Sequence, residues 1–337
     1  MATAHGFQST TSTHDPLYYG LRKQLVQRRQ RLEQALERGA TGQLLALLDE
    51  VDAALARMQD GSFGVCEACL EPIEVERLVA DPLSRLCIGH LTPEQQRVLE
   101  ADLELAASLQ KRLLPSPRVQ CDGWCVAYDY RPAGLVSGDY VDVLTTPDRS
   151  LFFALGDVSG KGVAASMLMA NLSAMFRALV PLGVEPAQLV AHANRVFCES
   201  TLPTQYATLV VGRATPAGEV EIANAGHLEP LAFRNGEVSA LPSTGLPIGL
   251  FRDQQFPAAT VQLGAGDTLA LYSDGVSEAV DGGDNEYGIA RLTEVVRQSA
   301  ALGPQEAVAA CLRDLTAFRG AGRQTDDQTL LLLRRSE

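Results

Sequence analysis

The first third of the chain carries apolar residues at helical spacing. One set, four and seven residues apart, consists of Leu21, Leu25, Leu32 and Leu36. A second set keeps a four-three spacing and consists of Leu44, Leu48, Val51, Leu55 and Met58. Such spacing places apolar side chains on one face of a helix, and the glycine-flanked segment 39–42 between the sets suits a turn. The pattern predicts an antiparallel helical hairpin over residues 19–59, after a loose polar tail over residues 1–18.

A third helical pattern occupies the linker region 92–117. Thr92 suits the N-cap, Pro93 suits the first helical position, and Pro115 ends the helix. The face between them repeats at four-three spacing through Leu99, Leu103, Ala106, Gln110 and Leu113. Two heptads do not distinguish a helix that packs on itself, on the next domain or on a dimer mate. A homodimer formed through this helix is therefore one of the open hypotheses.

From residue 118 to residue 337, apolar runs of strand length alternate with helical blocks. The strand-like runs are 125–130, 151–155, 208–212, 220–224, 268–272 and 330–333. The helical blocks are 162–180, 186–199, 288–300 and 304–317. Strands and helices clustered in this way predict an α+β domain in which helices are laid on sheets.

Composition and charge exclude several classes of function. The chain has 337 residues and a formal net charge of −13, which disfavours direct nucleic-acid binding because that requires a basic surface. The longest apolar runs fall short of the ~18–20 residues of a membrane span. The N-terminus lacks the basic-then-apolar pattern of a secretory signal. We therefore expect a cytoplasmic protein with no membrane partner.

Three cysteines and a histidine have the spacing of a zinc site. Cys66-x-x-Cys69 is followed, after seventeen intervening residues, by Cys87-x-x-His90. Three thiolates and one imidazole suit tetrahedral Zn²⁺, and four protein ligands leave no open position for catalysis. The module, residues 60–91, is too small to build a core alone, so the metal would supply folding energy. The seven cysteines are odd in number, which argues against a disulfide framework.

Acidic residues lie next to apolar runs or glycines at four places. They are Asp139 in Ser-Gly-Asp, Asp157 in Gly-Asp-Val-Ser-Gly, Asp274 in Ser-Asp-Gly, and the pair Asp326-Asp327. A single Asp-Gly is more often a turn than a ligand. Four carboxylates on loops beside strands suit two hard divalent cations such as Mn²⁺ or Mg²⁺, which can activate water for attack on phosphorus.

Residues 119–334 resemble the SpoIIE/RsbU branch of the PPM-type metal-dependent Ser/Thr protein phosphatases. The matching stretches, in family order, are RPAGLVSGDYVDV, LFFALGDVSGKGVAASMLMANL, YATLVV, EIANAGHLEPL, GLPIGL, LALYSDGVSEAVD and TDDQTLLLL. The resemblance implies an α/β/β/α sandwich over residues 118–337 with two Mn²⁺ or Mg²⁺ ions at one edge.

The resemblance also implies roles for individual residues. As catalytic metal ligands, Asp157 would bridge both ions, Asp139 and the backbone carbonyl of Val158 would serve one ion, and Asp274 with Asp326 would hold the other. Asp327 is the less favoured ligand of its pair. The residues expected to shape the site are Gly138, Gly156, Gly275, Asn224 and His227. A structural role for His227 is preferred over acid catalysis, and Arg131 and Lys161 are interpreted as surface residues rather than phosphate ligands.

Residues 19–91 resemble the DksA/TraR family through ALARMQDGSFGVCEAC, EPIEVERLVADP and LCIGH. The resemblance implies a zinc finger preceded by a helical hairpin, and such relatives insert the hairpin tip into RNA polymerase. Here the arms are only ~18 residues, or ~27 Å. The tip, residues 38–43, contains no acidic residue, and His90 stands where Cys is common. These departures disfavour polymerase binding and favour a regulatory or dimerising module.

The leading hypothesis is a phosphatase, controlled by its N-terminal region, that acts on phosphoserine or phosphothreonine in a partner protein. The resemblance implies a STAS-type anti-sigma-factor antagonist as that partner. The alternative is a DksA-like transcription regulator with a non-catalytic phosphatase-like domain, and a third is a scaffold without catalysis. Retention of all four aspartates favours the first.

Overall fold

The computed structural model of the chain divides into two compact units, residues 1–100 and residues 101–337. It describes residues 16–38, 42–90, 93–160, 162–201, 205–322 and 324–336. Most of the predicted tail, and residues 39–41 of the predicted turn, lie outside these ranges. The linker helix α4 (Pro93–Leu113) contains residues of both units.

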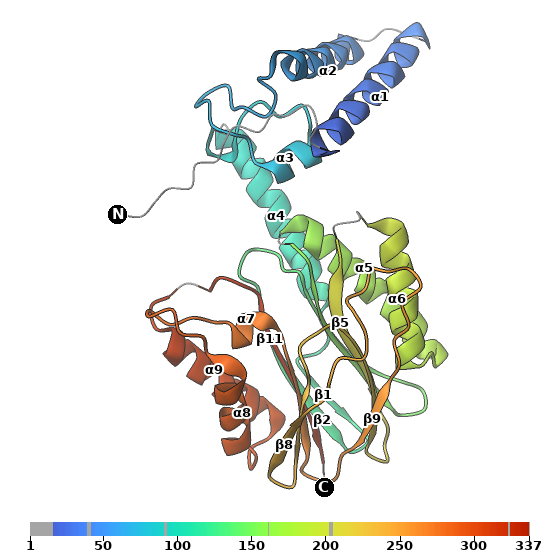
Figure 1. Ribbon diagram of the computed structural model, residues 1–337, viewed down its shortest axis with the longest axis vertical. Helices are drawn as coiled ribbons and strands as arrows, with labels where there is room; N and C mark the ends of the chain where they lie inside the picture. Colours follow the sequence, from blue (N-terminus) through green and yellow to red (C-terminus); the bar gives the residue numbers. More distant parts are fainter. Residues whose placement is uncertain are drawn as a thin grey trace. The chain divides into compact units, whose positions relative to one another are not determined.

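The first unit is built on two long helices, α1 (Pro16–Arg38) and α2 (Gly42–Asp60). A short helix α3 (Val75–Ala80) follows them (Figure 1). A 3-10 turn η1 (Ile88–His90) comes next along the chain. One core joins the hairpin to the segment after it and contains Leu21, Leu25, Leu32, Val51, Ala54, Met58, Phe63, Cys66, Ile73, Leu78 and Cys87. Leu36 and Leu44, also predicted to lie on these apolar faces, have side chains outside the described set.

The second unit contains two antiparallel sheets with strand orders β1-β2-β11-β10-β7-β8 and β3-β4-β5-β6-β9. The first six strands are β1 (Arg118–Cys121), β2 (Trp124–Arg131), β3 (Asp139–Thr145), β4 (Leu151–Val158), β5 (Ala207–Ala214) and β6 (Glu219–Ala225). The other five are β7 (Leu231–Arg234), β8 (Glu237–Ala240), β9 (Ala259–Gln262), β10 (Thr268–Tyr272) and β11 (Gln328–Arg335).

Helices cover the outer face of each sheet (Figure 1). Helices α5 (Val163–Leu179) and α6 (Pro186–Ser200) share a core with the five-stranded sheet, and the turn η2 (Val180–Leu182) joins them. Helices α8 (Gly288–Gln298) and α9 (Pro304–Arg319) share another core with the six-stranded sheet. The short helix α7 (Asp274–Ser277) follows β10. The predicted α/β/β/α sandwich is confirmed.

The continuous apolar runs of the sequence form strands that are buried on both faces. In β11, Leu331 and Leu333 point into the layer between the sheets, whereas Leu330 and Leu332 face the helices. Strand β4 alternates in the same way between the inter-sheet layer and the core under α5. Burial on both faces explains why these strands lack the apolar-polar alternation of a surface strand.

Strand β3 and four short strands were not predicted from the sequence. Strands β1, β7, β8 and β9 have only four residues each, too few to give a clear pattern. Strand β3 carries Asp139 and Asp142, and these two charged residues interrupt its apolar sequence pattern. Asp142 is nevertheless fully buried, because Arg177 donates to both of its carboxylate oxygens at 2.9 and 3.0 Å.

One segment, Val163–Leu182, has the length and composition of a membrane span. It corresponds to α5 and η2. Met169, Leu172 and Phe176 of this segment are buried in the core against the five-stranded sheet. Its apolar composition is therefore explained by packing inside the domain.

Candidate active site and zinc site

Asp139 and Asp157 face each other across two neighbouring strands. Asp139 is the first residue of β3, Asp157 is the last but one of β4, and the two are direct cross-strand partners. Residues in such register lie on the same face of the sheet, with side chains in contact distance. Both aspartates were predicted on loops; instead they belong to strands, because the β3–β4 ladder continues to the edge of the sheet.

This pair caps the apolar layer between the two sheets. Strand alternation puts Asp139 on the same face as Val141 and Val143, and Asp157 on the same face as Leu155, all three of which belong to the inter-sheet core. From the opposite sheet, Thr329 Oγ1 donates a hydrogen bond to Asp139 Oδ2 at 2.5 Å. The apolar layer thus ends in polar groups contributed by both sheets.

Asp274 and Asp326 lie at the corresponding end of the six-stranded sheet. Asp274 follows β10 and Asp326 precedes β11, which are antiparallel neighbours, so both residues lie at the same edge. A Cβ atom on Gly275 would come within 2.0 Å of the Asp327 carbonyl oxygen and 3.2 Å of the Asp326 carbonyl carbon. Glycine is therefore required beside Asp274, since the two segments approach each other at backbone distance.

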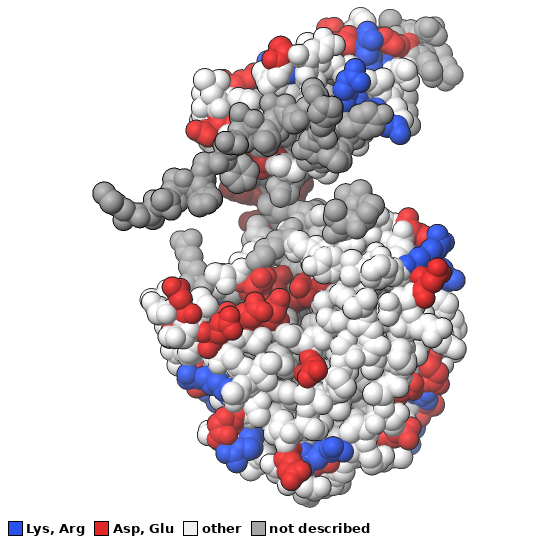
Figure 2. All heavy atoms as spheres, viewed as in Figure 1, with Lys and Arg blue, Asp and Glu red and all other residues white. Residues whose placement is uncertain are grey.

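Negative charge is concentrated at this edge. Burial, followed by the Asp157 and Asp327 carboxylates, raises the pKa of Asp139 well above its ordinary value, against hydrogen bonds from Thr329 and Ser273. Burial and the charges of Asp274, Glu286 and Asp326 also raise the pKa of Glu278. Acidic side chains form a cluster on the face of the second unit where Figure 1 draws α7 (Figure 2). Carboxylates crowded in this way are suited to bind cations.

Asp327 holds the loop before Asp139. Its two carboxylate oxygens accept hydrogen bonds from the backbone N–H groups of Ala133 at 2.7 Å and Gly138 at 2.9 Å. A Cβ on Gly138 would lie 3.0 Å from the Val158 carbonyl oxygen and 3.5 Å from Asp157 Oδ1. Gly138 therefore leaves room beside both predicted ligands, and Asp327 fixes the backbone around it.

His227 connects the two sheets beneath the aspartates. Thr208 Oγ1 donates to His227 Nδ1 at 2.8 Å, and His227 Nε2 donates to the Tyr272 carbonyl at 3.2 Å. Thr208 is the cross-strand partner of Asp157. Asn224 Oδ1 accepts from the His227 backbone N–H at 2.8 Å. Burial lowers the pKa of His227 to about 4. This neutral ring spans from β5, the strand beside Asp157, to β10, the strand that precedes Asp274.

Gly156 makes a close contact rather than a turn. It lies within β4, where a Cβ would come within 2.6 Å of the Thr208 carbonyl oxygen. Arg131 Nε donates to Asp129 at 2.7 Å, so its guanidinium is engaged in a local ion pair. Lys161 lies outside the described residues.

The first unit brings together the four predicted zinc ligands. Ligand atoms of Cys66, Cys69, Cys87 and His90 all lie within 4.8 Å of one another, the one group of three or more His, Cys, Asp or Glu with this property among the described residues. The Cys69 and Cys87 sulfurs are 3.7 Å apart. Two sulfurs bound tetrahedrally to one zinc at ~2.3 Å are separated by ~3.8 Å, so the residues present fit Zn²⁺.

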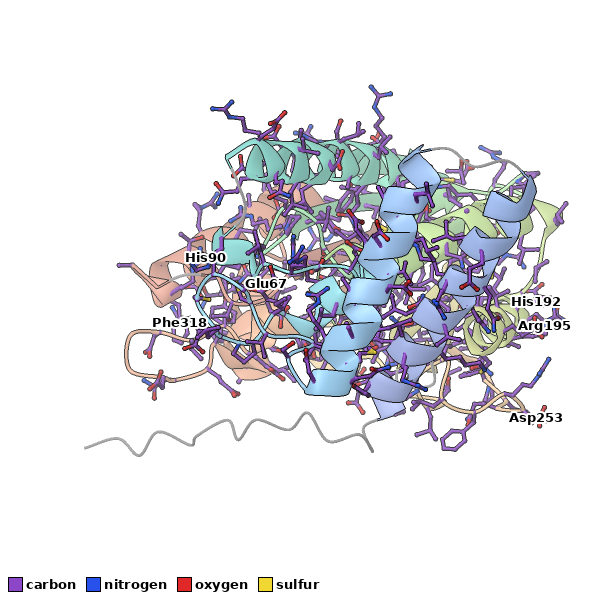
Figure 3. All side chains as sticks on the ribbon, turned by 90° about the horizontal axis from the view of Figure 1, so that it is seen from above. Glu67, His90, His192, Arg195, Asp253 and Phe318 are labelled. Carbon is purple, nitrogen blue, oxygen red and sulfur yellow. The ribbon has the colours of Figure 1, made fainter. Side chains whose placement is uncertain are left out.

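The surroundings of the cysteines favour metal binding. Backbone N–H groups, that of Cys87 foremost, lower the pKa of the Cys66 thiol to about 6, which favours the thiolate that binds zinc. Burial raises the pKa of Cys87 to about 11, an effect that a bound cation reverses. In Figure 3, His90 lies beside the loop that carries Glu67, the residue after Cys66. Cys66 and Cys87 are buried, whereas His90 is exposed.

Sequence reasoning missed the side chains that orient the aspartates. Thr329 and Ser273 face Asp139 from the opposite sheet. Period-two counting back from Leu331 and forward from Leu271 would have placed them there. It also took Gln110 for one more position of an apolar helical face. That polar residue was itself a signal, since Gln110 is buried and hydrogen-bonded to Ser137.

Comparisons with known proteins divide the chain in the same way. The family described as Stage II sporulation protein E (SpoIIE) matches residues 147–336, and the prokaryotic dksA/traR C4-type zinc finger matches residues 61–89. The phosphoserine phosphatase RsbU of Bacillus subtilis is 26% identical over 247 residues, which cover 71% of this chain and 72% of RsbU. Both family resemblances read from the sequence are thereby confirmed.

Solved structures give the same fold. The SiaA-PP2C domain of Pseudomonas aeruginosa superposes with a TM-score of 0.62 at 21% identity, covering 71% of this chain and 98% of that domain. The RsbU and RsbW domains of a Mycobacterium tuberculosis protein superpose with a TM-score of 0.58 at 26% identity. That match covers 66% of this chain and 62% of the M. tuberculosis chain, so a large part of the latter has no counterpart in the match.

Proposed function

The chain belongs to the SpoIIE family of serine/threonine protein phosphatases, and on that premise we propose that residues 118–337 hydrolyse a phosphoprotein with the help of two Mn²⁺ or Mg²⁺ ions. The observation that carries the proposal is the register of β3 and β4, which sets Asp139 directly opposite Asp157. Asp274 follows β10 and Asp326 precedes β11 at one edge of the other sheet, at the end from which Thr329 reaches Asp139.

The residues have separate tasks in this proposal. Asp157 would be shared between the ions, Asp139 and the Val158 carbonyl would hold one of them, and Asp274 with Asp326 would hold the other. When bound, the ions supply a lowered pKa for water and neutralise phosphoryl oxygens. Thr329 fixes the orientation of the Asp139 carboxylate through its hydrogen bond to Oδ2. Asp327 is assigned to the loop rather than to an ion, since both of its oxygens accept backbone N–H groups.

His227 is assigned a positioning role rather than proton transfer. Its ring is buried, both ring nitrogens have partners, and its pKa of about 4 keeps it neutral near pH 7. A general acid must carry a proton that it can deliver to the leaving group. The Nε2 proton of His227 is instead used to bind the Tyr272 carbonyl.

For the substrate we propose phosphoserine or phosphothreonine on a STAS-type anti-sigma-factor antagonist. Similarity to RsbU, named as a phosphoserine phosphatase, supports this choice. We also propose a cytoplasmic location and control of turnover by the N-terminal hairpin and zinc module. The purified chain should release phosphate from candidate phosphorylated STAS proteins only when Mn²⁺ or Mg²⁺ is present. Equal release in excess chelator and after Asp157→Ala would refute the proposal.

A homodimer through α4 is part of the proposed control. Val98, Leu105 and Leu109 repeat at spacings of seven and four and are 58, 60 and 57% exposed. An exposed stripe of this kind is typical of a coiled-coil seam. We expect Leu109→Asp to change turnover and leave both metal sites intact. Ser108→Asp, at the exposed position directly before Leu109, serves as the control. Unchanged turnover in Leu109→Asp would remove the stripe from the mechanism.

The dksA/traR-type zinc finger supports a second candidate function, binding to RNA polymerase. The absence of an acidic residue from 38–43 argues against it. A pull-down of RNA polymerase with the whole chain, compared with a chain lacking residues 19–91, separates the two functions. Capture that depends on 19–91, combined with no phosphate release, would favour the second.

A further inference from the structure

The loop that leads into Asp139 is held by a side chain of α4. Gln110 Nε2 donates to the Ser137 carbonyl at 2.7 Å, and Gln110 Oε1 accepts from the Ser137 N–H at 3.0 Å. Gln110 is only 5% exposed, and Ser137 is fully buried. A single amide therefore satisfies both backbone groups of one buried residue. Loss of such a pair leaves buried polar groups without partners.

The same loop connects directly to the metal site. Ser137 Oγ accepts the backbone N–H of Asp139 at 3.0 Å, so Ser137 bonds to α4 on one side and to Asp139 on the other. The backbone N–H of Gly138, the residue between Ser137 and Asp139, is bound by Asp327. The backbone immediately before Asp139 is thus fixed by two side chains, one from the sheet edge and one from α4.

A second contact ties the end of α4 to the strand that Asp139 begins. Arg177 of α5 donates to the Leu113 carbonyl at 2.7 Å. The same guanidinium donates to both carboxylate oxygens of Asp142 in β3. The C-terminal part of α4 is therefore linked to the chain just before Asp139 and, through Arg177, to β3 three residues after it.

We infer that Gln110 is a positioning residue for Asp139 and that its two hydrogen bonds to Ser137 support metal binding. The inference rests on the proposed function for the role of Asp139. With both Gln110 hydrogen bonds in place, at 2.7 and 3.0 Å, the loop presents Asp139 to the cation. Without them the loop is released, so metal affinity falls while substrate recognition is unaffected.

The test uses the full chain carrying Gln110→Met, which removes both hydrogen bonds at similar length. Gln110→Glu, whose carboxylate can accept but not donate, is the second variant. The control is Lys111→Met at the neighbouring exposed position. Mn²⁺ binding is measured by calorimetry on metal-stripped protein, with Asp157→Ala as the blank. The kcat and KM are measured on a phosphoserine peptide, and folding is followed by thermal unfolding.

We expect the Mn²⁺ dissociation constant of Gln110→Met to rise about tenfold, the effect typical of removing a group that orients a metal ligand. The kcat of Gln110→Met should fall while its KM remains unchanged. Lys111→Met should match the wild-type chain, and the values for Gln110→Glu should lie between those of the wild-type chain and Gln110→Met. Mn²⁺ affinity and kcat within twofold of the control would overturn the inference, as would loss of cooperative unfolding in both variants, which would make the amide merely structural. A wild-type chain without Mn²⁺-dependent hydrolysis would refute the proposed function, and Mn²⁺ affinity would still decide the role of Gln110.

Discussion

The zinc module and the aspartate site are both suited to bind cations, but they are built in opposite ways. The zinc ligands come from one short segment, Cys66 to His90, and two of them belong to the small core of their unit. The aspartates come from four segments between Asp139 and Asp326 and lie at the rim of a large two-sheet core. We expect the first site to need its metal in order to fold, and the second to fold first and then bind metal.

We expect the two kinds of cation to have different roles. Around the cysteines, the apolar core is small and includes Cys66 and Cys87 themselves, so ligand bonds to zinc would add to its stability. Around the aspartates, apolar packing on both sides holds carboxylates close together against their repulsion, and burial raises the pKa of Asp139. We expect the binding energy of the cations there to be available for chemistry instead of folding.

Removing zinc should unfold one unit and spare the other. Zinc binding contributes about 10–16 kcal/mol in small zinc modules at pH 7. We expect Cys69→Ala to abolish amide protection in residues 16–90 while residues 118–336 keep theirs, as measured by hydrogen exchange. His90→Cys, which gives the zinc site four thiolates, should retain the fold of the first unit. Protection of α1 and α2 in zinc-free protein would show that the module folds without metal.

Replacing Asp157, the aspartate proposed to bind both ions, should lower activity and leave the fold intact. We expect Asp157→Ala to lower kcat by more than about a hundredfold, the upper range for groups that only orient a ligand. The melting temperature should not fall, because the substitution relieves repulsion with Asp139. Phosphate release and calorimetry of the same sample check both statements. A large loss of stability would mean that this site, too, is needed for folding.

The adjacent Asp326 and Asp327 separate metal binding from loop support. Asp326→Asn should weaken Mn²⁺ binding by about tenfold or more. Asp327→Asn keeps one acceptor oxygen for the loop and should have a smaller effect on Mn²⁺ affinity. The control measurement is hydrogen exchange at the backbone N–H groups of Ala133 and Gly138, which should increase in Asp327→Asn but not in Asp326→Asn. The opposite ranking of metal affinities would assign Asp327 to the cation.

The smallest effect is expected at His227. Its pKa is lowered to about 4, so the neutral ring stabilises the fold above about pH 6.5, and this contribution is lost as pH falls toward 4. His227→Leu should cost about 1–3 kcal/mol near pH 7, the cost of unpaired buried polar groups, and should flatten the pH dependence of stability in that window. Turnover should keep the shape of its pH profile. Loss of one limb of that profile would instead indicate proton transfer by His227.

The sequence predicted most of the architecture because strands buried on both faces leave continuous apolar runs, such as LFFAL in β4 and LLLL in β11. It did not predict β3, where Asp139 and Asp142 interrupt the pattern, and so it placed Asp139 on a loop. The zinc ligands could be read from spacing, since they lie in one segment. The roles of Thr329, Asp327 and Gln110 could not, because each depends on contacts between segments far apart in the chain.

Anomalous diffraction from crystals of the whole chain soaked in Mn²⁺ would show whether the aspartates hold two ions. We expect two manganese peaks about 3.5–4 Å apart, with Asp157 bound to both, Asp139 to one and Asp274 with Asp326 to the other. We also expect a separate zinc peak among Cys66, Cys69, Cys87 and His90. Manganese found only at the cysteine cluster, or no manganese beside Asp157, would contradict the proposed two-ion site.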